Sequence, residues 1–198
     1  MIPSTLPPDP ADTPATLLDS WTLALTQAGW QQRAPTLSVH RAEQAQVREL
    51  TDPTGLLAVH VTWHSPQEIR NTELWSTPPT GAGHPDWRVR SAVLPASVIL
   101  AAAQAAGNEP GPTVADRLEA TGWYLAAQDY DEDGHLFERS FTTCDRTGWV
   151  ILTAPDPGAD HDNGSWSITR PGALRGPTPI HASPQTPAAV ITALALAP

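Results

Sequence analysis

The sequence contains no lysine, a single cysteine and no long apolar run, and each shortage narrows the range of functions. All eleven basic residues are arginines, against 21 acidic residues, and the resulting net charge of -10 argues against a broad phosphate-binding face. The lone thiol, Cys144, excludes an internal disulfide, and its place in an expected strand predicts a small buried side chain. No segment approaches the roughly 18 apolar residues that a membrane span requires, and the N-terminus lacks a signal-peptide pattern. We therefore expect a cytoplasmic protein without membrane contact.

Matching blocks of residues recur in the two halves of the chain. Hydrophobic residues make up 40% of the 198 positions, enough for one large domain or two small ones. Three blocks recur in the same order: 25–30 with 118–123, 52–55 with 145–148, and 95–99 with 187–191. The spacing within these pairs is 93, 93 and 92 positions. Matching order and spacing indicate two diverged copies of one module.

Each copy is predicted to run from a helix, through an antiparallel meander of about four strands, to a second helix. Gly29 and Gly122 follow the apolar periodicity of the first helices and are expected to end them in the left-handed conformation. Alternation of apolar and polar residues over 57–64 predicts a strand with one wet face. Before the last helix, Thr186 is expected to cap and Pro187 to occupy the first turn.

The predicted fold class is therefore α+β in two tandem repeats. Four segments are expected: a flexible N-terminal tail at 1–12, a first repeat at 13–107, a linker at 108–112 and a second repeat at 113–198. Clustered prolines in the tail and the linker favour these boundaries, because proline interrupts regular structure.

The second copy carries a pattern that resembles a known family. The pattern is Leu118-x-x-x-Gly122-Trp123, then Trp149, then Trp166-Ser167-Ile168, and finally Ser183-x-x-Thr186-Pro187-Ala188-x-Val190-Ile191-x-Ala193-Leu194. It resembles a streptomycete domain of unknown function that often occurs in tandem, DUF family three-one-seven, over most of 113–197. The resemblance over 16–106 is weaker, since Leu94 replaces the capping threonine. The resemblance to this family implies the α+β fold and an actinomycete source. The arginine-only composition, which is typical of a GC-rich genome, agrees with such a source. The family supplies no active site.

An acidic segment has the opening spacing of a calcium loop. Asp129, Asp131 and Asp133 alternate before Gly134, so their carboxylates could converge on a hard cation. The twelfth position of such a loop is Ser140, where a bidentate glutamate is needed. The favoured interpretation is a solvated acidic turn between two strands, and no metal is assigned.

Two histidines share one face of a predicted strand. His60 and His64 lie four positions apart, which could begin a zinc site if His40 or His84 approached. No third ligand is evident from the sequence, so two solvent-facing histidines are the favoured interpretation. No cofactor is expected.

Tryptophans and arginines provide the candidate binding surface. Four of the eight tryptophans recur in both copies, which predicts a core or module-packing role: Trp30, Trp75, Trp123 and Trp166. The candidate surface consists of residues on expected strands whose rings or charges could reach a partner: Trp63, Trp87, Arg88, Arg90 and Trp149. Arginine beside an aromatic ring on an open sheet can hold single-stranded nucleic acid. A solvated edge strand with charges that prevent aggregation is the favoured alternative.

The sequence contains no catalytic pattern such as Gly-x-Ser-x-Gly, a phosphate-binding glycine loop or a cysteine and histidine at catalytic spacing. The leading hypothesis is a non-catalytic binding module that contacts a protein partner or a second copy of itself through a sheet face or the groove between the copies. The alternatives are a single-stranded nucleic-acid-binding protein and an enzyme with its site between the two repeats.

Overall fold

A computed structural model describes residues 17–33, 36–37, 46–65, 68–77, 86–107, 111–154, 164–171 and 179–197. The tail expected at 1–12 and part of the linker expected at 108–112 lie outside these residues. The same holds for His40, His84 and the side chain of His64, three of the four histidines considered for a zinc site.

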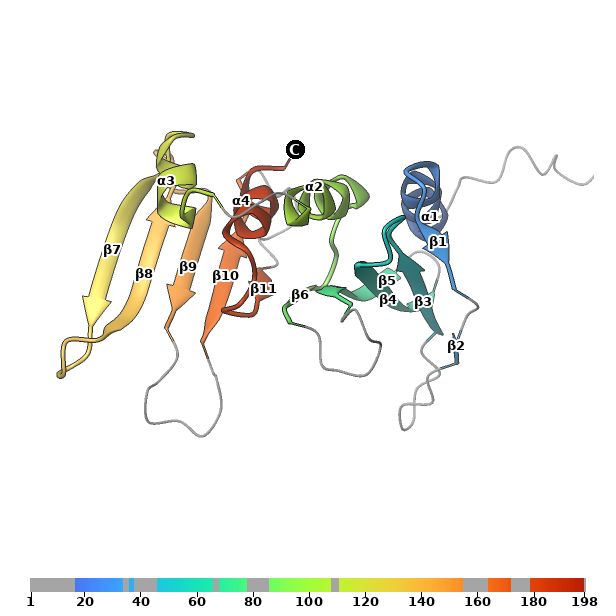
Figure 1. Cartoon of the computed structure of the whole chain (residues 1–198), viewed down its shortest axis with the longest axis horizontal. Helices are drawn as coiled ribbons and strands as arrows, with labels where there is room; N and C mark the ends of the chain where they lie inside the picture. The colour runs from blue at the N-terminus through green and yellow to red at the C-terminus, as the bar shows by residue number, and fades with distance from the viewer. Residues whose placement is uncertain are drawn as a thin grey trace, which may run out of the picture.

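Eleven strands in the described residues form one antiparallel sheet (Figure 1). Their bounds are β1 Gln31–Gln32, β2 Thr36–Leu37, β3 Gln46–Thr51, β4 Leu57–Ser65, β5 Glu68–Ser76, β6 Arg88–Ser91, β7 Tyr124–Tyr130, β8 Leu136–Thr142, β9 Trp149–Thr153, β10 Ser165–Thr169 and β11 Ile180–Ala182. The strand order is β1-β3-β4-β5-β6-β11-β10-β9-β8-β7, with β2 beside β3. The first half of the chain therefore joins the second edge to edge through β6 and β11, a pair that we call the seam.

Four helices of the described residues lie in a row on one side of this sheet (Figure 1). They are α1 Leu17–Gln27, α2 Ala96–Ala106, α3 Val114–Glu119 and α4 Ala188–Leu196. The helices α2 and α4 come from different halves and pack against each other beside the seam. The fold is therefore α+β with an antiparallel sheet, as predicted. Each half has five strands on the main path of the sheet, where about four were expected.

The core lies between the helices and the sheet. Leu50, Val59, Leu74 and Val89 are successive cross-strand neighbours, and all are 0% exposed. Because side chains alternate along a strand, the neighbouring positions point to the opposite face, which carries no helix of the described segments. His60 and Thr62 on that face are half-buried, which confirms the alternation predicted for β4.

The helix ends follow the sequence in part. Gly29 and Gly122 have φ values of 88° and 87°, the left-handed conformation predicted for them. The prediction that Thr186 caps α4 is wrong, because Pro187 is the N-cap residue and makes no side-chain cap bond. Thr186 is instead buried, and its hydroxyl lies 3.1 Å from the Ser183 hydroxyl.

The environment of Cys144 also differs from the prediction. Its thiol is exposed, and the residue lies in the turn between β8 and β9 rather than in a strand. The cause is the adjacent carboxylate of Asp145, which accepts hydrogen bonds from the Thr143 hydroxyl and the Thr147 backbone and thereby stabilises a turn.

None of the helices in the part of the chain that the structure describes is long and apolar enough to cross a bilayer.

Candidate binding site at the seam

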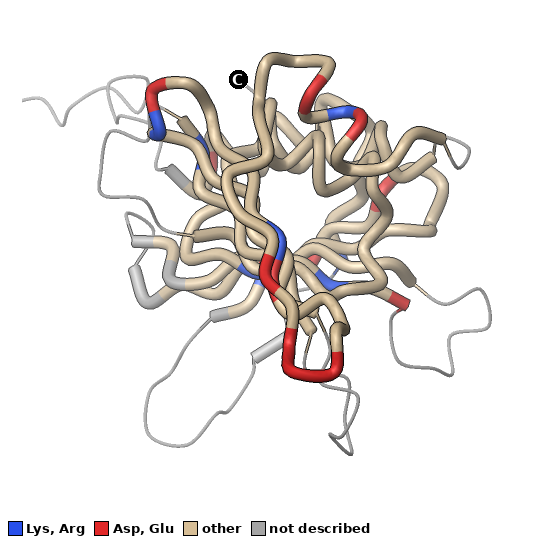
Figure 2. Tube along the Cα trace, turned by 90° about the vertical axis from the view of Figure 1, so that its left-hand side faces the viewer, with Lys and Arg blue, Asp and Glu red and all other residues tan. Residues whose placement is uncertain are grey.

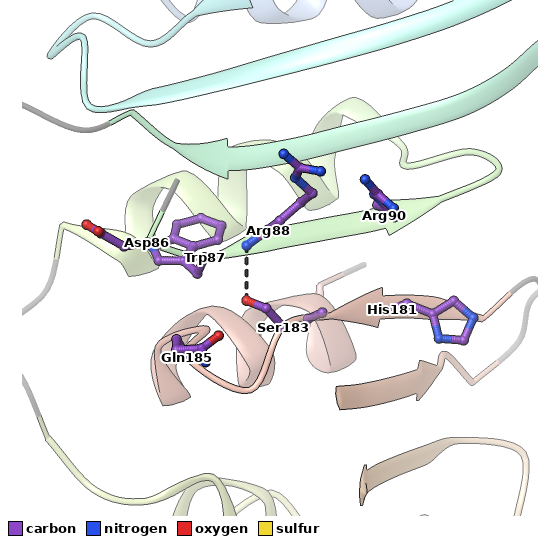
Figure 3. A pocket seen from close by; sticks show the side chains of 8 residues that line it. Asp86, Trp87, Arg88, Arg90, His181, Ser183 and Gln185 are labelled. Carbon is purple, nitrogen blue, oxygen red and sulfur yellow. Dashed lines mark hydrogen bonds between the residues drawn. The ribbon is translucent and has the colours of Figure 1, made fainter. Parts of the chain in front are cut away.

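An open pocket of about 380 Å³ lies at the seam between β6 and β11 (Figure 3). Eight residues line it: Asp86, Trp87, Arg88, Arg90, His181, Ala182, Ser183 and Gln185. Four come from each half of the chain, so the pocket exists only because the two halves share one sheet.

The strand register determines which side chains at the seam lie on the open face of the sheet. Val89 pairs with Ala182, and both are buried on the helix side of the sheet. Arg90 pairs with His181, and both therefore lie on the face without helices, where they are exposed.

Beyond the end of β11, Ser183 continues the pairing with β6. Its backbone N–H donates to the carbonyl of Arg88 at 2.8 Å. Its hydroxyl accepts from the backbone N–H of Arg88 at 3.1 Å, the bond drawn in Figure 3. These two bonds hold the backbone of Arg88 against the second half of the chain.

The two arginines of the pocket differ in their partners. Arg90 Nε lies 3.1 Å from a carboxylate oxygen of Glu73, and its side chain is 54% exposed. Arg88 Nε is buried and has no hydrogen-bond partner among the described residues. A buried N–H group without a partner is uncommon in proteins and points to water or a ligand that completes it.

The ion pair of Arg90 belongs to a cross-strand row on the face without helices. The row runs from Glu49 on β3 through His60 and Glu73 to Arg90, each opposite the next. His60 Nε2 lies 2.7 Å from Glu49, and Glu49 also pairs with Arg33 at 2.9 Å. Glu73, a member of this row, therefore holds the side chain of Arg90. Arg88 is not a member of the row.

The structure brings together three of the five predicted surface residues, Trp87, Arg88 and Arg90, in the pocket. Nevertheless, the prediction of exposed rings is wrong for Trp87 and Trp63, which are only 7% and 6% exposed. A buried indole cannot stack on a nucleic-acid base, so the nucleic-acid hypothesis loses its aromatic platform.

The remaining two predicted residues lie away from the seam. Trp63 shares the helix side of β4 with Val61, and the guanidinium of Arg48 lies 5.4 Å from the centroid of its ring. Trp149 is half-buried on β9, where its ring N–H donates to the carbonyl of Arg146 at 3.1 Å. Neither residue contributes to the pocket.

The candidate calcium segment is a hairpin turn between β7 and β8, as the favoured interpretation predicted. One oxygen of Asp131 accepts from the backbone N–H groups of His135 and Asp133, at 2.8 and 3.0 Å. The bond from the His135 backbone is the largest cause that lowers the pKa of Asp131. The carboxylate is thus occupied within its own turn, and within the described ranges no three potential metal-ligating side chains gather. Asp129 and Asp133 are exposed on either side of it.

Five pocket residues were not revealed by the sequence: Asp86 from the first half, and His181, Ala182, Ser183 and Gln185 from the second. No local pattern identifies them, because their role depends on the pairing of β11 with β6. No protein-family model matches the chain, and comparisons with curated proteins and with solved structures returned no match.

Proposed function

We propose that the chain is a non-catalytic interaction module that binds an extended, basic segment of a partner protein along its edge strand β7. The observation that carries the proposal is the exposure of this strand. Among the strands that the structure describes, β7 is the last of the sheet and pairs with β8 alone, and six of its seven residues are exposed. β1, which ends the main path on the other side, has two residues. A long edge offers unpaired N–H and C=O groups to an incoming strand.

Apolar side chains lie beside this free edge. Eight large hydrophobic residues are exposed in the described segments, and four of them belong to the β7–β8 hairpin: Tyr124, Leu125, Tyr130 and Phe137. Their exposed fractions run from 38% to 57%. Such a group of apolar side chains supplies contact area to a strand that adds to the edge.

The charge of the hairpin indicates the chemistry of the partner. Within 124–142, five carboxylates stand against one arginine: Asp129, Asp131, Asp133, Glu132 and Glu138 against Arg139. Figure 2 shows the acidic residues gathered at the tip of one hairpin. A second copy of the chain, with its net charge of -10, would bring like charges together at this edge. An extended segment with alternating apolar and basic side chains matches both the apolar and the acidic groups.

A peptide-binding experiment tests strand addition. The probe is a fluorescent peptide of alternating valine and arginine, and the controls are its glutamate counterpart and a version with alternate backbone nitrogens methylated. We expect fluorescence anisotropy to detect binding of the first peptide alone, and hydrogen exchange to slow along β7. Leu125→Lys should weaken binding about tenfold, because it places a cation at the edge, whereas Leu23→Lys on α1 should not.

Two outcomes would refute the proposal. Equal binding of the methylated peptide would mean that charge alone, without backbone pairing, holds the probe. A dimer in light scattering that Leu125→Lys dissociates would assign the edge to a second copy of the chain.

We also infer that the halves are two copies of one module, of the kind that the streptomycete resemblance implies. Support comes from equivalent backbone bonds. The backbone N–H of Trp30 donates to the Leu25 carbonyl at 3.1 Å, and that of Trp123 to the Leu118 carbonyl at 3.1 Å. Both halves also have the order helix, strands, helix, and their strand orders mirror each other about the seam.

Paired substitutions test this inference. Leu25 and Leu118 are each 0% exposed, so replacing either with alanine should cost about 2–5 kcal/mol of unfolding free energy. Urea denaturation measures both. A neutral effect at one member of the pair would argue against equivalent positions.

A further inference from the structure

We propose that the seam pocket binds a small organic anion, whose carboxylate or phosphate group is held by the guanidinium of Arg88. This site is separate from the β7 edge. A guanidinium group carries five N–H donors and forms paired bonds to planar or tetrahedral oxyanions. Arg88 Nε is buried, lacks an acceptor in the part of the chain described, and belongs to a residue that lines the pocket.

Three arginines of the described residues have a buried Nε without a hydrogen-bond partner, and Arg88 differs from the other two in its position at the pocket. Arg139 and Arg170 also have a buried Nε without a partner among the described residues. Neither of them lines the seam pocket. Of the three arginines, Arg88 is therefore the one that also lines this pocket.

Neighbouring groups add donors around the same space. Arg90 lies on β6, the same strand as Arg88, and also lines the pocket (Figure 3). Its Nε pairs with Glu73, and its exposed guanidinium has further N–H groups that can donate to a ligand. The exposed imidazole of His181 lies opposite Arg90 across the seam. The hydroxyl of Ser183 lies on the other side, bonded to the backbone of Arg88. These groups place donors from both halves of the chain along the lining of the pocket.

The charge around the pocket favours a small anion over a nucleic-acid strand. Two arginines and one carboxylate, Asp86, line the pocket, so its charge is opposite in sign to that of the chain. Affinity for a nucleic-acid strand depends on neutralising several phosphates, and a chain with a net charge of -10 is poorly suited to hold phosphates beyond the pocket. Trp87, the aromatic residue in the lining, is 7% exposed and cannot stack on a base.

A ligand here would also join the two halves. The seam ladder contains two register pairs, Arg90 with His181 and Val89 with Ala182. An anion held by Arg88 from one strand and by His181 or Ser183 from the other would bridge these strands. Binding should therefore raise the melting temperature with ligand concentration, as for any ligand specific to the folded state.

The experiment follows the arginine Nε–Hε NMR signals of the full chain during titration with inorganic phosphate and, separately, with succinate. We expect a saturable shift of the Arg88 signal with at least one probe, and the tighter probe identifies a phosphate or a carboxylate ligand. Arg88→Gln should weaken binding about tenfold or more in calorimetry, because charged hydrogen bonds are lost. Arg88→Lys keeps the positive charge but cannot form the paired bonds, so its affinity for the anion should lie between those of the parent chain and Arg88→Gln.

Arg139→Gln is the matched control, since it removes a second arginine with an unmet Nε outside the pocket and should change affinity less than twofold. Equal weakening by Arg88→Gln and Arg139→Gln would overturn the proposal in favour of a general charge effect. The absence of a saturable Arg88 shift with both probes would also overturn it. If a thymidine oligonucleotide bound more tightly than both small anions, and Arg88→Gln weakened that binding, the ligand would be a nucleic-acid strand and the proposal would be overturned. Arg88→Gln should leave peptide binding at β7 unchanged, which separates the two proposals.

Discussion

Gly148 lies where an added methyl group would have no space. A Cβ atom at this position would be 2.8 Å from Pro171 Cγ and 2.9 Å from Trp123 Cη2. Carbon atoms pack best at about 3.5–4.0 Å, so the neighbours would have to retreat by roughly 0.6 Å or more. Trp123 is 5% exposed and confined by the core. The backbone is also held, because the Gly148 carbonyl accepts from the Thr142 hydroxyl at 2.8 Å and the Gly148 N–H donates to the Thr143 hydroxyl at 3.0 Å.

We expect Gly148→Ala to lower the free energy of unfolding by about 1–3 kcal/mol, the usual cost of overpacking. For a chain of this size each kcal/mol corresponds to about 2–4 °C in melting temperature. Urea denaturation followed by tryptophan fluorescence measures the change. Gly107→Ala is the control, because its nearest atom would be 3.8 Å away and its φ of -80° suits any residue. If Gly148→Ala unfolded within about 0.5 kcal/mol of the parent chain, the steric reasoning would be refuted.

Three further predictions concern other parts of the fold. The ring N–H of buried Trp21 donates to the Leu94 carbonyl at 3.0 Å, so Trp21→Phe should cost about 1–3 kcal/mol in urea denaturation by leaving that carbonyl unpaired. Thr113 caps α3 with its hydroxyl, and Thr113→Ala should cost about 1 kcal/mol and speed hydrogen exchange in α3 first. The pKa of Asp131 is lowered from its ordinary 3.8, chiefly by the His135 backbone N–H. Its contribution to stability is therefore full above that value and is lost as the pH falls through the lowered pKa, so an acid titration of stability should decline less steeply in Asp131→Asn.

Local features of the sequence were predicted best. The left-handed glycines Gly29 and Gly122 and the alternation along β4 depend on backbone geometry and on neighbours within a few residues. The acidic hairpin between β7 and β8 likewise rests on interactions within its own turn, where Asp131 accepts bonds from residues two and four positions later. Such contacts form in much the same way whatever surrounds them.

Predictions of burial failed where they required knowledge of which sheet face the helices cover. Trp63 and Trp87 were expected to offer exposed rings, yet both are packed in the core. The alternation along β4 already placed Trp63 on the apolar face of that strand, so its burial followed from the pattern, whereas the four residues of β6 are too few for periodicity to assign the face of the neighbouring Trp87. The exposed Cys144 has a different origin, since its expected strand ends at Thr142 and a side-chain-stabilised turn begins.

The sequence by itself determined the class and order of most elements, the acidic hairpin turn and the two helix ends at Gly29 and Gly122, because these depend on short-range geometry. Only the tertiary structure decided the seam and its pocket. Arg88 and Ser183 are 95 positions apart and meet because β6 and β11 pair at the centre of one sheet. The helices α2 and α4, also from different halves, pack against each other beside this pair, and no residue spacing within either strand specifies a partner so distant in the sequence.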